Sequence, residues 1–338
     1  MRAVLGVEGG GSHTHAVVAD ASGQILGVGK NNDAANWEDV GISAASAAIR
    51  SCVTEAIGAA GLQTSEISTS VFGLAGIDFP VDEQLLSGIP LALGLAASTF
   101  LVNDAFVALR AGTDQSFGVV VVAGTGSIIA GRNPEGDVFR TLGLGPKFGD
   151  SGSGTEVSEA SVSAVAAAAI GKGPDTVLTE MLCRQTNSDS VENFLEGAAR
   201  GRIDDALFAP LVVEAANQGD QVACGILSEA GQRIGENAVH VLRTLGMENM
   251  AFEVVLAGGM FLYGGRLFAG GVESVVRRVA PNAHFVLLEA PPVVGAVLIA
   301  LDLAGEQPRP GMRETLARAT VSALGLPAAS ALNQLRTA

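Results

Sequence analysis

The sequence predicts an α/β fold made of two similar domains, and three observations support this prediction. The chain has 338 residues, more than one hydrophobic core of ordinary size needs. Short apolar runs of strand length alternate with segments of helical spacing, which indicates mixed sheets flanked by helices. A pattern of strands and glycine-rich turns near the N-terminus also recurs in the middle of the chain, which indicates a duplicated domain.

The two copies of this pattern begin at residues 4 and 118. The first copy, residues 4–26, has an apolar strand, the turn Gly9-Gly10-Gly11-Ser12, a second strand, a polar turn and a third strand. The second copy, residues 118–139, has the same order, with Gly124-Thr125-Gly126-Ser127 as its first turn. Each half is therefore expected to open with a meander of strands.

The other segments continue the alternation. Further strands are predicted at 69–74, 100–102, 253–256 and 284–288, and helices at 42–60, 105–111, 156–170, 204–217, 221–245 and from 292 onwards. We expect one domain at 1–112 and the other at 113–307. The segment at about 308–338 is expected to form a C-terminal helix that packs back on the first domain.

Composition excludes several classes of protein. Hydrophobic residues make up 48% and charged residues 16%, as in folded globular proteins. The formal charge of −15 disfavours nucleic acid as a partner, but it leaves ATP possible because Mg²⁺ and backbone N–H groups hold phosphates. No apolar run is long enough for a signal peptide or a membrane span, and three scattered cysteines form no disulfide pattern. A cytoplasmic location without membrane partners fits best.

The two glycine-rich turns are candidates for phosphate binding. At Gly9, Gly10 and Gly11 no Cβ keeps an anion from the backbone N–H groups, and Ser12 adds a hydroxyl donor. Glu8 would hold Mg²⁺ directly or through water. A single turn of this kind is equally a tight hairpin. Because Gly124, Thr125, Gly126 and Ser127 repeat it in the second half, phosphate binding is the preferred interpretation.

Asn103 and Asp104 stand at the end of one predicted strand, where a helix begins. In open α/β sheets this edge faces the ligand crevice. Asp104 would there accept the proton of a substrate hydroxyl that attacks phosphorus. The alternative is that Asp104 only caps the helix.

Two other segments are candidates for ligand contact. Gly258 and Gly259 follow the strand at 253–256 and leave room for adenine and ribose, although a helix start without a ligand is equally consistent. Asn36 and Trp37 suit a hydroxylated ligand, or an ordinary Asn-rich turn. The histidines lack the spacings of familiar metal motifs, so no metal site is predicted from them.

In their order along the chain, Glu8-Gly9-Gly10-Gly11-Ser12, Asn103-Asp104-Ala105, Gly124-Thr125-Gly126-Ser127, Gly149-Asp150-Ser151-Gly152-Ser153 and Ala257-Gly258-Gly259 resemble the N-acetylglucosamine kinases. These belong with the BadF/BadG-type ATPases to the superfamily of sugar kinases, heat-shock protein 70 and actin. The resemblance implies two actin-like, ribonuclease H-like domains with ATP in a cleft between them. It implies Mg²⁺, frequent homodimers and transfer to the 6-hydroxyl of the sugar.

The resemblance also assigns roles to residues. Asp104 would be the base, the two glycine loops would hold phosphates, and Gly258 and Gly259 would lie beside adenosine. The residues near the sugar would be Asn36, Trp37, Asp104, Thr125, Gly126 and Asp150. Leu144 and Ser151 depart from the family pattern, in which Trp and Glu are usual.

The sequence therefore predicts an ATP- and Mg²⁺-dependent kinase of an amino sugar. N-acetylglucosamine is the first candidate, with glucosamine and N-acetylmuramic acid behind it. One alternative is an ATPase that activates a dehydratase, whose relatives hold an iron–sulfur cluster through cysteines. The other is a sugar sensor without catalytic activity.

Overall fold

The computed structural model describes residues 3–95, 98–204, 208–306 and 309–327. The chain divides into two compact units, one of residues 1–120 with 288–338 and the other of residues 121–287. The boundaries expected from the sequence were 112 and 307, so the segment 288–307 falls in the first unit instead of the second. Parts of the expected helices at 204–217 and 308–338 lie outside the described residues.

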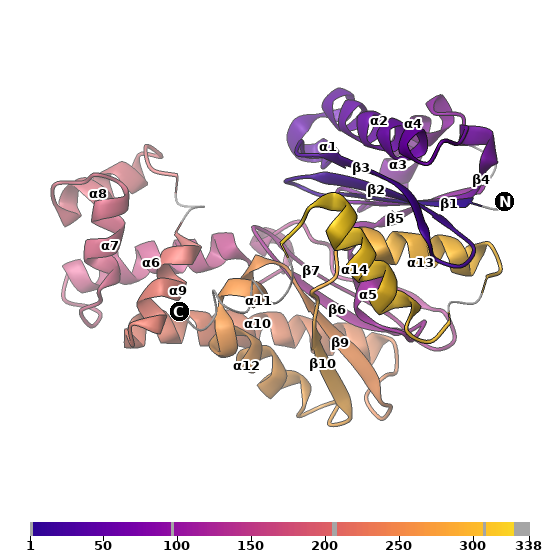
Figure 1. The fold of residues 1–338 in the computed structure, drawn as a ribbon. Helices are drawn as coiled ribbons and strands as arrows, with labels where there is room; N and C mark the ends of the chain where they lie inside the picture. The colour runs from indigo at the N-terminus through magenta and orange to yellow at the C-terminus, as the bar shows by residue number, and fades with distance from the viewer. Residues whose placement is uncertain (1–2, 96–97, 205–207, 307–308, 328–338) are drawn as a thin grey trace. The chain divides into compact units, whose positions relative to one another are not determined.

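The first unit is built on a sheet with the strand order β3-β2-β1-β4-β5 (Figure 1). Its elements are β1 (Ala3–Gly9), β2 (Thr14–Asp20), β3 (Ile25–Asn31), α1 (Trp37–Val40), α2 (Ile42–Ala59), the 3₁₀ turn Thr64–Glu66, β4 (Ile67–Leu74), α3 (Pro80–Leu86), α4 (Gly88–Ala92), β5 (Thr99–Asn103), α5 (Asp104–Gly112), α13 (Val293–Leu303) and α14 (Met312–Leu324). β1, β2 and β3 form an antiparallel meander, whereas β4 and β5 run parallel to β1.

The register of the parallel strands positions the site. Gly9 of β1 pairs with Leu74 of β4, and Leu74 pairs with Asn103 of β5. The carboxyl ends of three neighbouring strands are therefore level. Whatever follows these strands in the chain meets at one edge of the sheet.

Helices cover both faces of this sheet (Figure 1). On one face α2 packs on β2 and β3, and on the other α13 packs on β1, β4 and α5. Close approach requires glycine at two of these contacts. A Cβ at Gly29 would lie 1.9 Å from the Cys52 carbonyl oxygen of α2, and one at Gly295 would lie 1.8 Å from the Val107 carbonyl oxygen of α5. Helix α14 packs on β3 and α13.

The second unit repeats the design of the first. Its elements are β6 (Gly118–Ala123, cut by the unit boundary), β7 (Ser127–Arg132), β8 (Val138–Arg140), the 3₁₀ turn Pro146–Phe148, α6 (Gly154–Ala169), α7 (Leu178–Gln185), α8 (Val191–Ala199), α9 (Ala209–Asn217), α10 (Gln221–Thr244), β9 (Phe252–Ala257), α11 (Gly259–Tyr263), α12 (Gly265–Val276) and β10 (Ala283–Leu287). The strand order of the second sheet is β10-β9-β6-β7-β8. Read from β8, these strands take the same places as β3, β2, β1, β4 and β5 in the first sheet. The expected duplicated α/β fold is thus confirmed.

Helices α6 to α9 follow the meander of the second unit and pack mainly on one another and on α10 (Figure 1). The sequence did not predict the short helices α1, α3, α4, α7 and α8. Among the helices that the structure describes, none has both the length and the apolar character needed to cross a bilayer.

Candidate functional site

The first glycine turn joins β1 to β2 at the level edge of the first sheet. The Gly10 N–H donates to the His13 carbonyl at 3.1 Å and closes the turn, while Gly11 and Ser12 are exposed at its tip. A Cβ at Gly9 would lie 2.7 Å from the Cβ of Ala35, so packing alone requires glycine there. The exposed tip has the backbone form that an anion-binding loop needs.

Glu8 lies beneath this turn between two histidines. Its Oε2 is 3.5 Å from His13 Nε2 and 3.7 Å from His15 Nδ1, and the side chain is only 7% exposed. The Glu8 carboxylate raises the pKa of His13 above its usual range, whereas burial lowers the pKa of His15 to about 4. Among the described residues, Glu8 Oε2 and His15 Nδ1 are buried without a hydrogen-bond partner.

Asn36 and Trp37 stand beside the same turn. The Gly10 carbonyl accepts hydrogen bonds from the N–H groups of Ala35 and Asn36 at 2.9 and 3.2 Å. The Asn36 side chain caps α1, and the Trp37 indole donates to the Gly76 carbonyl at 2.7 Å. The start of α1 and the residues before it are therefore tied to the first glycine turn and to the loop after β4.

Asp104 is the first residue of α5, and the cap of that helix is Asn103. Asn103 Oδ1 accepts the Ala105 N–H at 3.0 Å, while its Nδ2 donates to the Ile77 carbonyl at 3.2 Å and to Asp78 Oδ1 at 3.3 Å. The alternative that Asp104 serves only as a cap is therefore wrong, because the buried Asn103 performs that role. Asp104 itself is half-buried.

Several carboxylates of α1, α3 and the loop after β4 lie near one another. Burial raises the pKa of Glu38, and the nearby carboxylates of Asp78, Asp82 and Asp39 raise it further. Asp82 also accepts the N–H groups of Asp78 and Phe79 at 3.0 and 2.7 Å, which fixes the loop after β4. Such a set of acceptors suits a ligand rich in hydroxyl groups.

The second glycine turn joins β6 to β7 and rests on the start of α6. Its Gly124 carbonyl accepts the Gly154 N–H at 2.8 Å, and its Thr125 carbonyl accepts the Thr155 N–H and hydroxyl at 3.2 and 3.0 Å. A Cβ added at Gly124 or Gly126 would meet none of the described atoms within 4 Å. The space beside both Gly124 and Gly126 is therefore open.

Asp150 is a buried residue of the loop between β8 and α6. Its Oδ2 accepts the N–H groups of Leu144 and Gly145 at 2.7 and 3.0 Å. The Asn237 amide, on α10, donates to the Gly149 carbonyl at 3.1 Å and to Ser151 Oγ at 3.3 Å. Asp150 thus shapes the loop that contains Leu144.

Gly258 follows β9 and lies directly against β6. Its φ is +99°, and a Cβ there would lie 2.3 Å from the Ala123 carbonyl oxygen. Gly259 begins α11. The pair therefore stands next to the second glycine turn, which begins at Gly124.

The structure brings the residues predicted from the sequence together in two groups, one in each unit. The first holds Glu8, Gly9, Gly10, Gly11, Ser12, Asn36, Trp37 and Asp104. The second holds Gly124, Thr125, Gly126, Ser127, Asp150, Gly258 and Gly259.

Sequence reasoning missed two features of the first group. Asp78 stands after the predicted strand 69–74, and the strand-end rule applied to Asp104 would have found it. His13 and His15 join Glu8 because β1 pairs with β2, with Glu8 opposite His15. A search for helical or Cys-His spacings could not detect a pairing across strands.

Comparison with known proteins places these residues in a family. The model of the BadF/BadG/BcrA/BcrD ATPase family matches residues 5–300. The N-acetyl-D-glucosamine kinase of Dictyostelium discoideum is 30% identical over 312 residues, which cover 88% of this chain and 97% of the relative. The N-acetylmuramic acid/N-acetylglucosamine kinase of Clostridium acetobutylicum is 28% identical over 269 residues, which cover 77% and 86%.

A solved structure has the same fold. It is a Chromobacterium violaceum protein assigned as an N-acetylglucosamine kinase, with a TM-score of 0.68 and 24% identity. The match covers 89% of this chain and 99% of that chain.

Proposed function

The chain belongs to the BadF/BadG/BcrA/BcrD ATPase family, and we propose that it is an ATP-dependent kinase of an amino sugar. The two curated relatives are kinases of N-acetylglucosamine, and one of them is also named for N-acetylmuramic acid. N-acetylglucosamine, converted to its 6-phosphate, is the first candidate substrate. Glucosamine and N-acetylmuramic acid follow it.

The observation that carries the proposal is the position of Asp104. Asp104 is half-buried and is the first residue of α5. It lies at the same edge of the sheet as the first glycine turn, which follows β1. Asn103 is the N-cap of α5, so Asp104 stands in the first turn of the helix and not at its cap. We propose that Asp104 accepts the proton of the sugar hydroxyl as the hydroxyl oxygen attacks the γ-phosphorus of ATP.

Asp78 is a second carboxylate near Asp104, held by the same asparagine. Its Oδ1 accepts a hydrogen bond from the Asn103 amide. We propose that Asp78, like Asn36 and Trp37, helps to hold the sugar.

The glycine turns are the proposed phosphate loops. Gly11 and Ser12 are exposed, and the space beside Gly124 and Gly126 is open, so a phosphate can approach the backbone N–H groups at each turn. Gly258 and Gly259 would contact adenosine, and Thr125, Gly126 and Asp150 would contact the sugar.

Mg²⁺ is the expected companion of ATP, and the buried carboxylate of Glu8 is suited to a cation. Its Oε2 faces His13 Nε2 at 3.5 Å and makes no hydrogen bond among the described residues, so a cation or a bound water would complete it. Mg²⁺ would neutralise charge on the phosphates. We propose that Glu8 holds it through water, because the carboxylate lies beneath the turn.

We also propose that the enzyme acts as a homodimer in the cytoplasm, where ATP is available. Light scattering on the eluted peak of a sizing column gives the mass that checks the dimer. A mass of about 34.1 kDa, that of one chain, would contradict it.

The test is ADP release coupled to a second enzyme, with Mg-ATP and a panel of N-acetylglucosamine, glucosamine, N-acetylmuramic acid, N-acetylmannosamine and glucose. One amino sugar is expected to stimulate turnover. Asp104→Asn is expected to lower kcat by about 10²–10⁴-fold, the contribution of a positioned base. The matched control is Asp114→Asn, which removes a surface ion pair with Arg313 and should leave kcat unchanged.

Each other outcome points to another function. ADP release that is equal with and without sugar would favour an ATPase that activates a dehydratase. Sugar binding by calorimetry without any ADP would favour a sensor. Full activity in Asp104→Asn would refute the assignment of the base but leave the kinase assignment intact.

A further inference from the structure

We propose that Glu8, His13 and His15 form a binding site for a divalent transition metal such as Zn²⁺, separate in chemistry from the Mg²⁺ that accompanies ATP. The three residues come from β1, the first glycine turn and β2. Their potential ligand atoms all lie within 4.8 Å of one another. The site does not depend on the kinase assignment, because it rests only on these three side chains.

The spacing of the ligand atoms fits a tetrahedral ion. Zn²⁺ binds histidine nitrogen and carboxylate oxygen at about 2.0–2.2 Å, so two ligand atoms of a tetrahedral site are about 3.3–3.6 Å apart. Glu8 Oε2 is 3.5 Å from His13 Nε2 and 3.7 Å from His15 Nδ1. The two histidine nitrogens lie within 4.8 Å of each other, so the rings would draw together by up to about 1 Å to bind one ion.

Burial gives an independent reason to expect a ligand. The Glu8 and His15 side chains are 7% and 4% exposed, and Glu8 Oε2 and His15 Nδ1 have no hydrogen-bond partner among the described residues. Buried polar atoms in native proteins almost always have a partner. A cation between them would supply one to both atoms at once.

The surroundings support a histidine ligand that is held in place. His13 directs Nε2 toward Glu8, and its other ring nitrogen, Nδ1, is 2.8 Å from Ser12 Oγ. Metal-binding histidines commonly make such a second contact, which fixes the orientation of the ring. His13 is 40% exposed at the side chain, so an ion can enter from that side.

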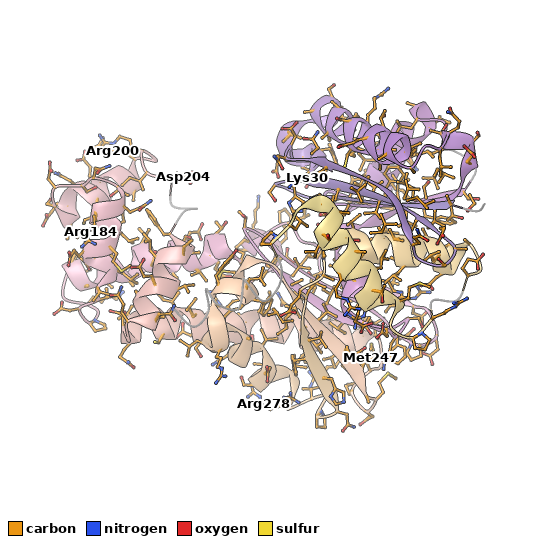
Figure 2. All side chains as sticks on the ribbon, viewed as in Figure 1. Lys30, Arg184, Arg200, Asp204, Met247 and Arg278 are labelled. Carbon is orange, nitrogen blue, oxygen red and sulfur yellow. The ribbon has the colours of Figure 1, made fainter. Side chains whose placement is uncertain are left out.

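One positively charged side chain, that of Lys30, lies on the adjoining strand β3. Lys30 of β3 pairs with His15 in the sheet, and its ammonium donates to the Leu324 carbonyl at the end of α14 at 3.3 Å (Lys30 is labelled in Figure 2). The ammonium therefore has a partner of its own. Glu8 supplies the negative charge at the site.

The ligand set selects against Mg²⁺. Imidazole nitrogen suits Zn²⁺ and its neighbours in the first transition row, whereas Mg²⁺ prefers oxygen ligands and keeps its waters. Three protein ligands leave a tetrahedral ion one open position, for water or an anion. Because Ser12 belongs to the proposed phosphate loop and Glu8 is proposed to hold Mg²⁺, a bound ion would be expected to compete with Mg-ATP.

The experiment measures Zn²⁺ binding directly on the full chain. Protein freed of metal with EDTA is titrated with ZnCl₂ against a chromophoric chelator, in the presence of millimolar Mg²⁺. One Zn²⁺ per chain is expected. Loss of a residue that only supports a metal ligand weakens binding roughly 10–100-fold. His13→Gln and His15→Gln each remove a ligand and are expected to weaken Zn²⁺ binding by more than this. Ser12→Ala is expected to weaken it within that range.

The control is His284→Gln, which removes an exposed histidine of β10 and should leave binding unchanged. Co²⁺ gives a second readout, since a four-coordinate ion absorbs visible light far more strongly than the hydrated ion. If His15→Gln fails to fold, His13→Gln decides the question, because His13 is the more exposed of the two. No Zn²⁺ binding by the wild type, or equal binding by His13→Gln, would overturn the proposal; so would equal losses in His13→Gln and His284→Gln.

Discussion

Asn103 offers a quantitative test of how the fold holds Asp104 at the edge of the sheet. Its buried side chain makes the cap to the Ala105 N–H and donates to the Ile77 carbonyl and to Asp78. A cap contributes about 1 kcal/mol, and each further hydrogen bond about 1 kcal/mol net. Asn103→Ala should therefore lower the free energy of unfolding by about 3 kcal/mol.

Asn103→Ser separates the two contributions. Serine is as good a cap as asparagine, but its hydroxyl cannot replace the amide that donates to the loop after β4. The serine variant should therefore lose about 2 kcal/mol, and the difference between the two variants should be about 1 kcal/mol, the value of the cap. A free-energy difference of this size is readily resolved in a denaturation curve.

The assay is urea unfolding followed by the fluorescence of Trp37, the single tryptophan of the chain. Trp37 lies in the first unit and donates to Gly76, in the same loop that Asn103 holds, so its signal reports on this region. The control is Asn31→Ala, which removes one local bond to the Asp33 N–H. If the free energies of unfolding of both Asn103 variants lie within about 1 kcal/mol of that of the control, this explanation of the role of Asn103 is refuted.

Three further predictions concern stability. Gly29→Ala should cost about 3 kcal/mol or more because its Cβ would collide with the Cys52 carbonyl of α2. Gly58 lies in α2 with open space where its Cβ would be, so Gly58→Ala should leave the free energy of unfolding unchanged or raise it by up to about 1 kcal/mol. The urea midpoints of the two variants test the contrast. Asp150→Ala should lower the melting temperature and raise the KM for the sugar, since the buried carboxylate accepts two backbone N–H groups; an unchanged KM would remove Asp150 from the sugar site. In metal-free protein, the free energy of unfolding should fall by about 3 kcal/mol between about pH 6.5 and pH 4, because burial keeps His15 neutral in the folded state while the unfolded chain takes up a proton. His15→Gln should flatten this part of the profile, and an equally steep profile would contradict the assignment.

Much of the fold could be predicted because its signals are local. The glycine turns, the apolar runs on either side of them and the long periodic segment that became α10 each specify an element within a few residues. Repetition of the meander predicted the second sheet, and the two mirrored strand orders confirm it. The helices missed, such as α7 and α8, are short, so they show too few turns for a helical period to stand out.

The sequence by itself determined the two-domain α/β plan, the glycine turns and the carboxylate at the end of β5, because backbone freedom and strand ends depend on neighbouring residues. Only the tertiary structure decided that Asn103, and not Asp104, caps α5, and that α13 packs in the first unit. The same holds for the cluster of Glu8 with His13 and His15. Strand pairing and helix packing bring together residues whose spacing along the chain carries no fixed period, so these contacts exist only after the chain has folded.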